Sequence, residues 1–276
     1  MNKYSHILAT LFSFFIAFFL FLGILIGTMK LTVINQRYLL NSLDDCSYYQ
    51  GIADALNTDF MQGAGAAGFE AKIFENFVTV EDVHNVSRQY ILESFENGIA
   101  EVKKELFQKK LSHYLHEVAK EAQMKLTDVD EKRLEAYIDI NVQAYQQYLS
   151  FPFLQYMVMG FDMMNNVVPF ILIACLILVS LAFYFLRRLH LDNENKTVYQ
   201  SSILFAVGLM LIIPCTILFI GKYIQRIQLT PEFYYRFFVY YIEGYFQILI
   251  LCGITLFICG ILIILMNQRK RIKSGL

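Results

Sequence analysis

The chain has 276 residues, of which 57% are hydrophobic and 17% charged; its net charge is −1 and its mean hydropathy is +0.45. Soluble chains average about 45–50% apolar and about 25% charged residues. The excess of apolar residues is gathered into long runs, which excludes a compact water-soluble globule, a disordered chain and a coiled-coil rod. The small net charge gives no electrostatic reason to expect nucleic acid as a partner.

The first apolar run covers residues 7–29 and contains no charged side chain. A bilayer core about 30 Å thick is crossed by about 20 apolar residues in a helix. A retained membrane anchor fits better than a cleaved signal peptide, because the run exceeds the usual apolar region and no small-residue cleavage site precedes Lys30. Residues 1–33 are therefore expected to form an N-terminal tail and the first transmembrane helix.

Three further apolar runs follow in the second half of the chain. Lipid offers no hydrogen-bond partners to the backbone, so each run is expected to be a helix. We expect these helices within residues 158–268, at about 160–187, 201–222 and 242–267. The sequence therefore predicts a bundle of four transmembrane helices, with a short outer loop between the third and the fourth.

Lysine and arginine in short flanking segments predict the orientation of the bundle, because cytoplasmic loops carry an excess of them. The basic residues on one side are Lys3, Arg187, Arg188, Lys196, Arg269, Lys270, Arg271 and Lys273. Both termini are thus expected in the cytoplasm of a cell bounded by this plasma membrane, with residues 269–276 as a basic cytoplasmic tail and residues 34–157 outside.

Residues 34–157 favour an all-α extracytoplasmic domain between the first and second spans, because no strand-like alternation competes with the helical signals. Thr79 with Asp82, and Thr127 with Asp130, have the spacing of helix N-caps with an acid in the first turn. Helices are expected near 36–44, 46–61, 69–77, 80–97, 99–126 and 128–150.

The sequence Thr230-Pro231-Glu232 is typical of an N-cap followed by a proline in the first helical position, so a helix is expected to begin there and to end near Gln268. Its first turns carry many aromatic residues, which favour the membrane–water boundary. These residues anchor the helix at the interface, or they line a groove for a lipid chain or a peptide.

No motif points strongly to catalysis, and we expect no enzyme activity, catalytic residue, cofactor or metal. Residues 63–68 read GAGAAG, but no strand precedes them as a dinucleotide site requires, so a flexible loop is expected. His113 and His116 lie opposite the apolar positions of their helix and are expected on the surface, with half a metal site as the alternative. Glu93 and Glu96 are interpreted as part of a solvated face.

Small residues indicate where the membrane helices pack. Gly23 and Gly27 have the spacing that lets two helices approach closely, and Gly253 and Gly260 repeat this feature in the last span. Packing within the bundle is the simpler interpretation, and homodimerisation is the alternative. Cys46 is the one cysteine outside the spans, so we expect it as a buried free thiol or, less simply, in a bond between chains.

Four ionisable residues lie near the expected outer boundary, one at the end of each span: Lys30, Asp162, Lys222 and Glu243. Two cations and two anions at one depth are expected to pair between helices, which lowers the cost of desolvation. The functional alternative is a gate or ion-binding mouth with nearby amide side chains. No charge lies near the centre of any span, which speaks against an ion-coupled pump.

Three short stretches carry a resemblance: residues 30–38 (KLTVINQRY), 47–49 (SYY) and 78–83 (VTVEDV). They resemble uncharacterised membrane proteins of low-GC Gram-positive bacteria, which share the layout of one span, a helical outer domain and three more spans. This resemblance implies a bacterial plasma membrane. FtsX- and MacB-type permeases are similar in topology alone, and the segment 187–200 is short for docking their ATPase.

These observations predict a non-enzymatic membrane protein whose outer domain binds an envelope partner or ligand, while lipid surrounds the bundle. A protein partner or a homo-oligomer is expected. The alternative is a transport-type protein, either a permease subunit working with an ABC ATPase or a small ion channel around the boundary charges.

Overall fold

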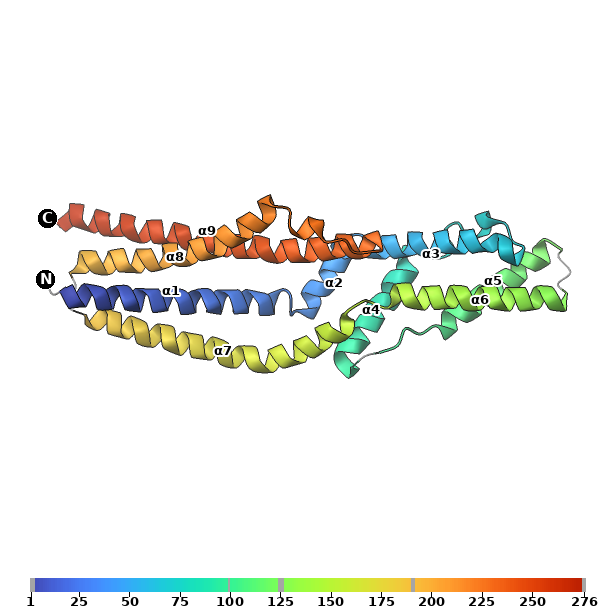
Figure 1. Ribbon diagram of the computed structural model, residues 1–276, viewed down its shortest axis with the longest axis horizontal. Helices are drawn as coiled ribbons and strands as arrows, with labels where there is room; N and C mark the ends of the chain where they lie inside the picture. The colour runs from blue at the N-terminus through green and yellow to red at the C-terminus, as the bar shows by residue number, and fades with distance from the viewer. Residues whose placement is uncertain (1–2, 99, 124–126, 190–191, 275–276) are drawn as a thin grey trace. The chain divides into compact units, whose positions relative to one another are not determined.

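The protein was analysed as a computed structural model that describes residues 3–98, 100–123, 127–189 and 192–274. This part of the chain is helical and contains no β-strand, so the predicted all-α class is confirmed (Figure 1). The elements are α1 (Lys3–Leu31), α2 (Gln36–Asp45), α3 (Tyr48–Ala64), η1 (Gly65–Ala67), η2 (Ala71–Phe74), α4 (Val80–Asn97), α5 (Glu105–Glu121), α6 (Asp128–Leu149), α7 (Leu154–Arg188), α8 (Asn193–Ile220), η3 (Ile224–Arg226) and α9 (Glu232–Ser274).

The chain divides into two compact units. Unit 1 comprises residues 1–39, 161–228 and 238–276, and unit 2 comprises residues 40–160 and 229–237. Helices α7 and α9 each contribute residues to both units.

Four helices of the described chain are long and apolar enough to cross a membrane, as the sequence predicts. Only 11–28% of the residues in each apolar stretch are buried within the protein, and the others are partly or fully exposed. Phe170 is 75% exposed and Ile220 is 78% exposed. Apolar surface on this scale is unfavourable in water and favourable in a hydrocarbon layer.

The helices of unit 1 run in alternating directions, so that α1 and α8 begin where α7 and α9 end (Figure 1). At this end the ring of Phe12 stacks on that of Phe185 with 5.6 Å between centroids, and His6 Nδ1 lies 3.2 Å from the Tyr199 hydroxyl. Alternating directions follow from the sequence, since short loops join α7 to α8 and α8 to α9.

Glycines lie where the helices of unit 1 approach one another. A Cβ atom at Gly23 or Gly27 of α1 would meet Cys175 or Leu172 of α7 at 3.8–3.9 Å, an ordinary contact distance. The approach of α8 and α9 is closer. A Cβ atom at Gly253 would lie 2.9 Å from the carbonyl oxygen of Gly208, and Gly260 faces the ring of Phe205. These predicted packing glycines therefore contact neighbouring helices within one chain.

We expect Gly253→Ala to lower the melting temperature of the protein in detergent, measured by circular dichroism. The new methyl group would press on backbone that cannot turn away, and overpacking of this kind costs about 1–3 kcal/mol. Gly23→Ala is the matched control, because its methyl group has room and alanine favours a helix. A Gly253→Ala protein as stable as the Gly23→Ala control would contradict this packing.

Unit 2 is built around an aromatic core. The Phe60 ring of α3 lies 6.0 Å from Phe74 and 5.9 Å from Phe107, measured between centroids, and Phe107 stacks on Tyr145 of α6 at 3.8 Å. These four residues are buried. Aromatic pairs add about 0.5–1.5 kcal/mol each beyond the area that they bury, so this cluster holds α3, α5 and α6 together.

One buried amide fixes the chain that leads into α4. The Asn57 side chain of α3 donates to the Val78 carbonyl at 2.9 Å and accepts from the Val78 amide at 2.9 Å. A buried backbone group left without a partner costs about 1–3 kcal/mol, and Asn57 satisfies both groups of Val78. This contact positions Thr79, whose hydroxyl accepts from the Asp82 amide and caps α4 as predicted.

Several predicted boundaries are wrong. The expected helix at 69–77 is only the short turn η2, because Asn76 adopts a left-handed conformation and Val78 is tied to Asn57. The expected helix at 99–126 begins at Glu105 and ends at Glu121; residues 99 and 124–126 lie outside the described residues. The GAGAAG segment is not a simple loop, since α3 includes residues 63 and 64 and η1 follows.

Two predicted helix starts have different outcomes. Thr127 and Asp130 form a complete capping box at the start of α6, as their spacing predicts. Pro231 is not the first residue of a helix. The Thr230–Pro231 bond is cis and α9 begins at Glu232, so Pro231 precedes the helix and its carbonyl accepts from the Tyr234 amide.

Candidate functional site

Unit 2 contains a pocket of about 170 Å³ between α4 and α5, with α6 contributing to its wall. Its apolar wall has four aromatic or branched residues that are at least nine-tenths buried: Val78 before α4, Tyr90 of α4, Phe107 of α5 and Tyr145 of α6. Leu106, at the edge of the pocket, is 74% exposed. A wall of apolar and aromatic side chains is typical of ligand pockets.

The rim of the pocket is charged. Lys110 of α5 pairs with Asp82 of α4 at 2.8 Å, and Lys103 before α5 pairs with Glu93 of α4 at 2.8 Å. Glu101 also lines the pocket, and it forms no ion pair in the part of the chain that the structure describes. The rim therefore carries charges of both signs. Glu93, which we expected on a solvated face, belongs to this pocket.

Asp82 pairs with Lys110 and contacts the N-cap residue Thr79, and both interactions stabilise its ionised form. Partial burial of its carboxyl favours the neutral acid, but the hydrogen bond and charge of Lys110 and the contacts with Thr79 together lower its pKa below the ordinary value of 3.8. For Glu93, hydrogen bonds from Lys103 and Gln89 lower the pKa of the carboxyl. Both carboxylates are therefore ionised at neutral pH.

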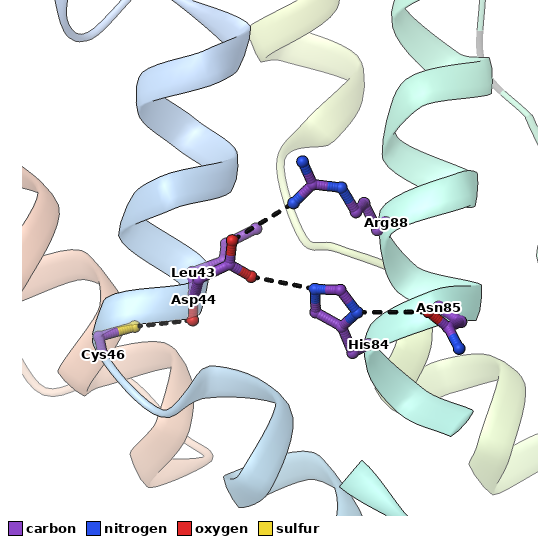
Figure 2. A network of polar contacts seen from close by, with 6 residues as sticks. All are labelled: Leu43, Asp44, Cys46, His84, Asn85 and Arg88. Atoms are coloured by element: carbon purple, nitrogen blue, oxygen red, sulfur yellow. Dashed lines mark hydrogen bonds and ion pairs between the residues drawn. The ribbon is translucent and has the colours of Figure 1, made fainter. Parts of the chain in front are cut away.

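A second polar cluster joins α2 to α4 (Figure 2). The two oxygens of Asp44 contact different partners: Oδ1 lies 3.2 Å from His84 Nε2, and Oδ2 lies 3.3 Å from Arg88 Nη1. His84 and Arg88 are one helical turn apart on α4, so a single carboxylate can reach both. The three side chains are each more than a third exposed, and exposed pairs of this kind contribute about 0–1 kcal/mol.

Next to this cluster lie the Cys46 thiol and the Tyr49 hydroxyl, and the pKa of each is raised. The Cys46 thiol donates to the Leu43 carbonyl at 3.7 Å, and burial raises its pKa to about 11. Tyr49, whose ring lies 4.9 Å from that of His84, has its pKa raised by burial and by the charge of Asp44. Cys46 is a half-buried free thiol in the structure, and a thiol with a raised pKa is a poor nucleophile.

The four boundary residues all belong to unit 1, where Lys30 and Glu243 are half-buried and Asp162 and Lys222 are exposed. Within the described residues no ion pair joins any two of them. The Glu243 carboxylate instead accepts a hydrogen bond from Gln225 at 3.1 Å. Pairing or gating by these residues stays a prediction.

The two histidines at 113 and 116 are exposed on α5. His113 lies 3.2 Å from Glu117, and His116 Nδ1 lies 2.7 Å from the Ser112 carbonyl. Among the described residues no group of three or more His, Cys, Asp or Glu side chains is placed to hold a metal ion. The exposure of His113 and His116 therefore agrees with their interpretation as surface histidines.

The pocket and the Asp44 cluster were both missed by the sequence analysis. Their members come from segments far apart in sequence, such as Asp44 and His84, and no spacing rule connects them. One signal was present: His84 and Arg88 have the spacing of one helix face. The pocket had none, because it depends on how α4 and α5 pack.

Comparisons with known proteins find no matching family model, no similar curated protein and no similar solved structure.

We expect unit 2 to lose stability as the pH falls from 5 to 2, and Asp82→Asn to reduce that loss. The folded state lowers the pKa of Asp82, so its contribution is present above the ordinary value of 3.8 and disappears as the pH falls through the lowered value. Thermal unfolding followed by circular dichroism measures the effect. Glu96→Gln, an exposed carboxylate of the same helix, is the control, and equal pH dependence of both variants would argue against this role of Asp82.

Proposed function

We propose that this protein is a non-enzymatic, multi-pass protein of a bacterial plasma membrane whose extracytoplasmic helical domain binds an envelope partner or ligand. The observation that carries the proposal is the pocket between α4 and α5, with its apolar wall and charged rim. A binding site needs shape, apolar area and a few polar groups to orient the ligand, and this pocket has all three.

The layout of unit 1 supports the membrane part of the proposal. Lysine and arginine flank the start of α1, the α7–α8 connection and the end of α9. In unit 1 these three places lie at the same end of the helices (Figure 1). One cytoplasmic side for all of them agrees with the excess of basic residues expected there. Residues 34–157 are then outside the cell.

One observation favours a second candidate function. Helices α7 and α9 pass from unit 2 into unit 1 without a break, so each unit contains part of the same two helices. A permease subunit of the FtsX or MacB type that transmits motion across the membrane would use such helices. The small-channel variant rests on the boundary charges, which have no contact with one another in the described residues.

Photo-crosslinking in native membranes tests the binding function. A photoreactive residue in place of Gln89, which lines the pocket, is expected to yield a covalent adduct that mass spectrometry detects as an added mass. Gln50, an exposed residue of α3 away from the pocket, is the matched control. Equal adducts at both positions, or none at Gln89, would count against a ligand in this pocket.

Cysteine labelling in intact cells tests the orientation. In a cysteine-free background, Glu96→Cys is expected to react with a membrane-impermeant maleimide in intact cells. Asp192→Cys is expected to react only after the membrane is opened, because the positive flanks place the α7–α8 connection inside. Both positions are exposed. Labelling with the opposite pattern would reverse the proposed topology.

A further inference from the structure

The charges around the α4–α5 pocket do not balance. Three carboxylates line it, those of Asp82, Glu93 and Glu101, but only two lysines. Asp82 forms an ion pair with Lys110, and Glu93 forms one with Lys103, each at 2.8 Å. Glu101 is exposed and forms no ion pair among the described residues. A ligand therefore meets one carboxylate whose charge nothing on the rim neutralises.

The apolar wall determines the size and chemistry of the uncharged part of the ligand. A cavity of about 150 Å³ lined by apolar side chains holds a benzene ring, so a pocket of about 170 Å³ has room for one aromatic or branched aliphatic group. The buried side chains of Tyr90 and Phe107 line it. Transfer of such a group from water to this wall is favourable, because it removes apolar surface from water.

We propose that the pocket binds the protonated amine of a small ligand with an aromatic or aliphatic body. The ammonium group pairs with Glu101 at the rim, and the body lies on the wall formed by Tyr90 and Phe107. Carboxylate ligands bind poorly, because the two lysines are already paired and the third carboxylate repels them. Two sources have this chemistry: a free amine, and the N-terminal residue of a peptide.

This inference rests on the proposed binding function and narrows it to a ligand class. The full chain in detergent is titrated by calorimetry with 2-phenylethylamine and with 3-phenylpropionate, which have the same ring and opposite charges. We expect saturable binding of the amine and at least tenfold weaker binding of the carboxylate. We expect higher salt to weaken amine binding, because the rim is exposed to solvent.

Glu101→Gln is expected to weaken amine binding about threefold to fivefold, since an ion pair with an exposed carboxylate contributes little. Glu96→Gln, an exposed carboxylate that does not line the pocket, is the control and is expected to change binding less than twofold. Both positions are exposed, so both variants are expected to fold, and circular dichroism verifies this.

Equal affinity for the amine and the carboxylate, an unchanged Glu101→Gln protein, or no amine binding at all would overturn the proposal. A crosslinked adduct at Gln89 together with no amine binding would refute the ligand class and leave the binding function in place; failure of both would remove both. The peptide Phe-Gly-Gly separates the sources: binding that acetylation of its N-terminus abolishes assigns a peptide, and binding of the free amine alone assigns a small molecule.

Discussion

The main constraint on this structure is that its four long apolar helices need apolar surroundings. In the apolar stretches of α1, α7, α8 and α9 at most 28% of the residues are buried, and the others are partly or fully exposed. Hydrocarbon accepts such surface, whereas water would drive it to aggregate. Lipid also leaves the backbone no partners other than its own, so these segments must be helical. The two short connections and the alternating helix directions of unit 1 follow from this constraint.

A lipid bilayer would not drive the helices of unit 1 together, since its tails are as apolar as leucine. Close contact has to come from shape, and Gly208 and Gly253 provide it by bringing the backbones of α8 and α9 together. Gly23 and Gly27 lie at a looser contact with α7. Glycines therefore matter more for packing between α8 and α9 than between α1 and α7, and their spacing in the sequence does not reveal this difference.

Unit 2 folds by the rules of a water-soluble protein. Its core is a cluster of stacked and edge-on aromatic rings, and its helix starts are capped by threonine hydroxyls at Thr79 and Thr127. The polar features lie at the junctions between helices, where Asp44 contacts α4 and where Lys110 pairs with Asp82. The cationic ligand proposed for the α4–α5 junction would require little rearrangement, because the wall is already formed and Glu101 has no ion pair to break in the described residues.

The sequence by itself determined the four helices long and apolar enough to cross a membrane, the all-α class and the capped starts of α4 and α6. These follow from local properties: apolar length, the absence of strand alternation, and a threonine three residues before an acid. It misplaced η2, the start of α5 and Pro231. At η2 the reason is the left-handed Asn76 and the contact of Asn57 with Val78, which periodicity does not reveal. Only the tertiary structure decided the α4–α5 pocket and the Asp44 cluster. Their residues come from separate segments, and packing of the helices of unit 2 brings them together.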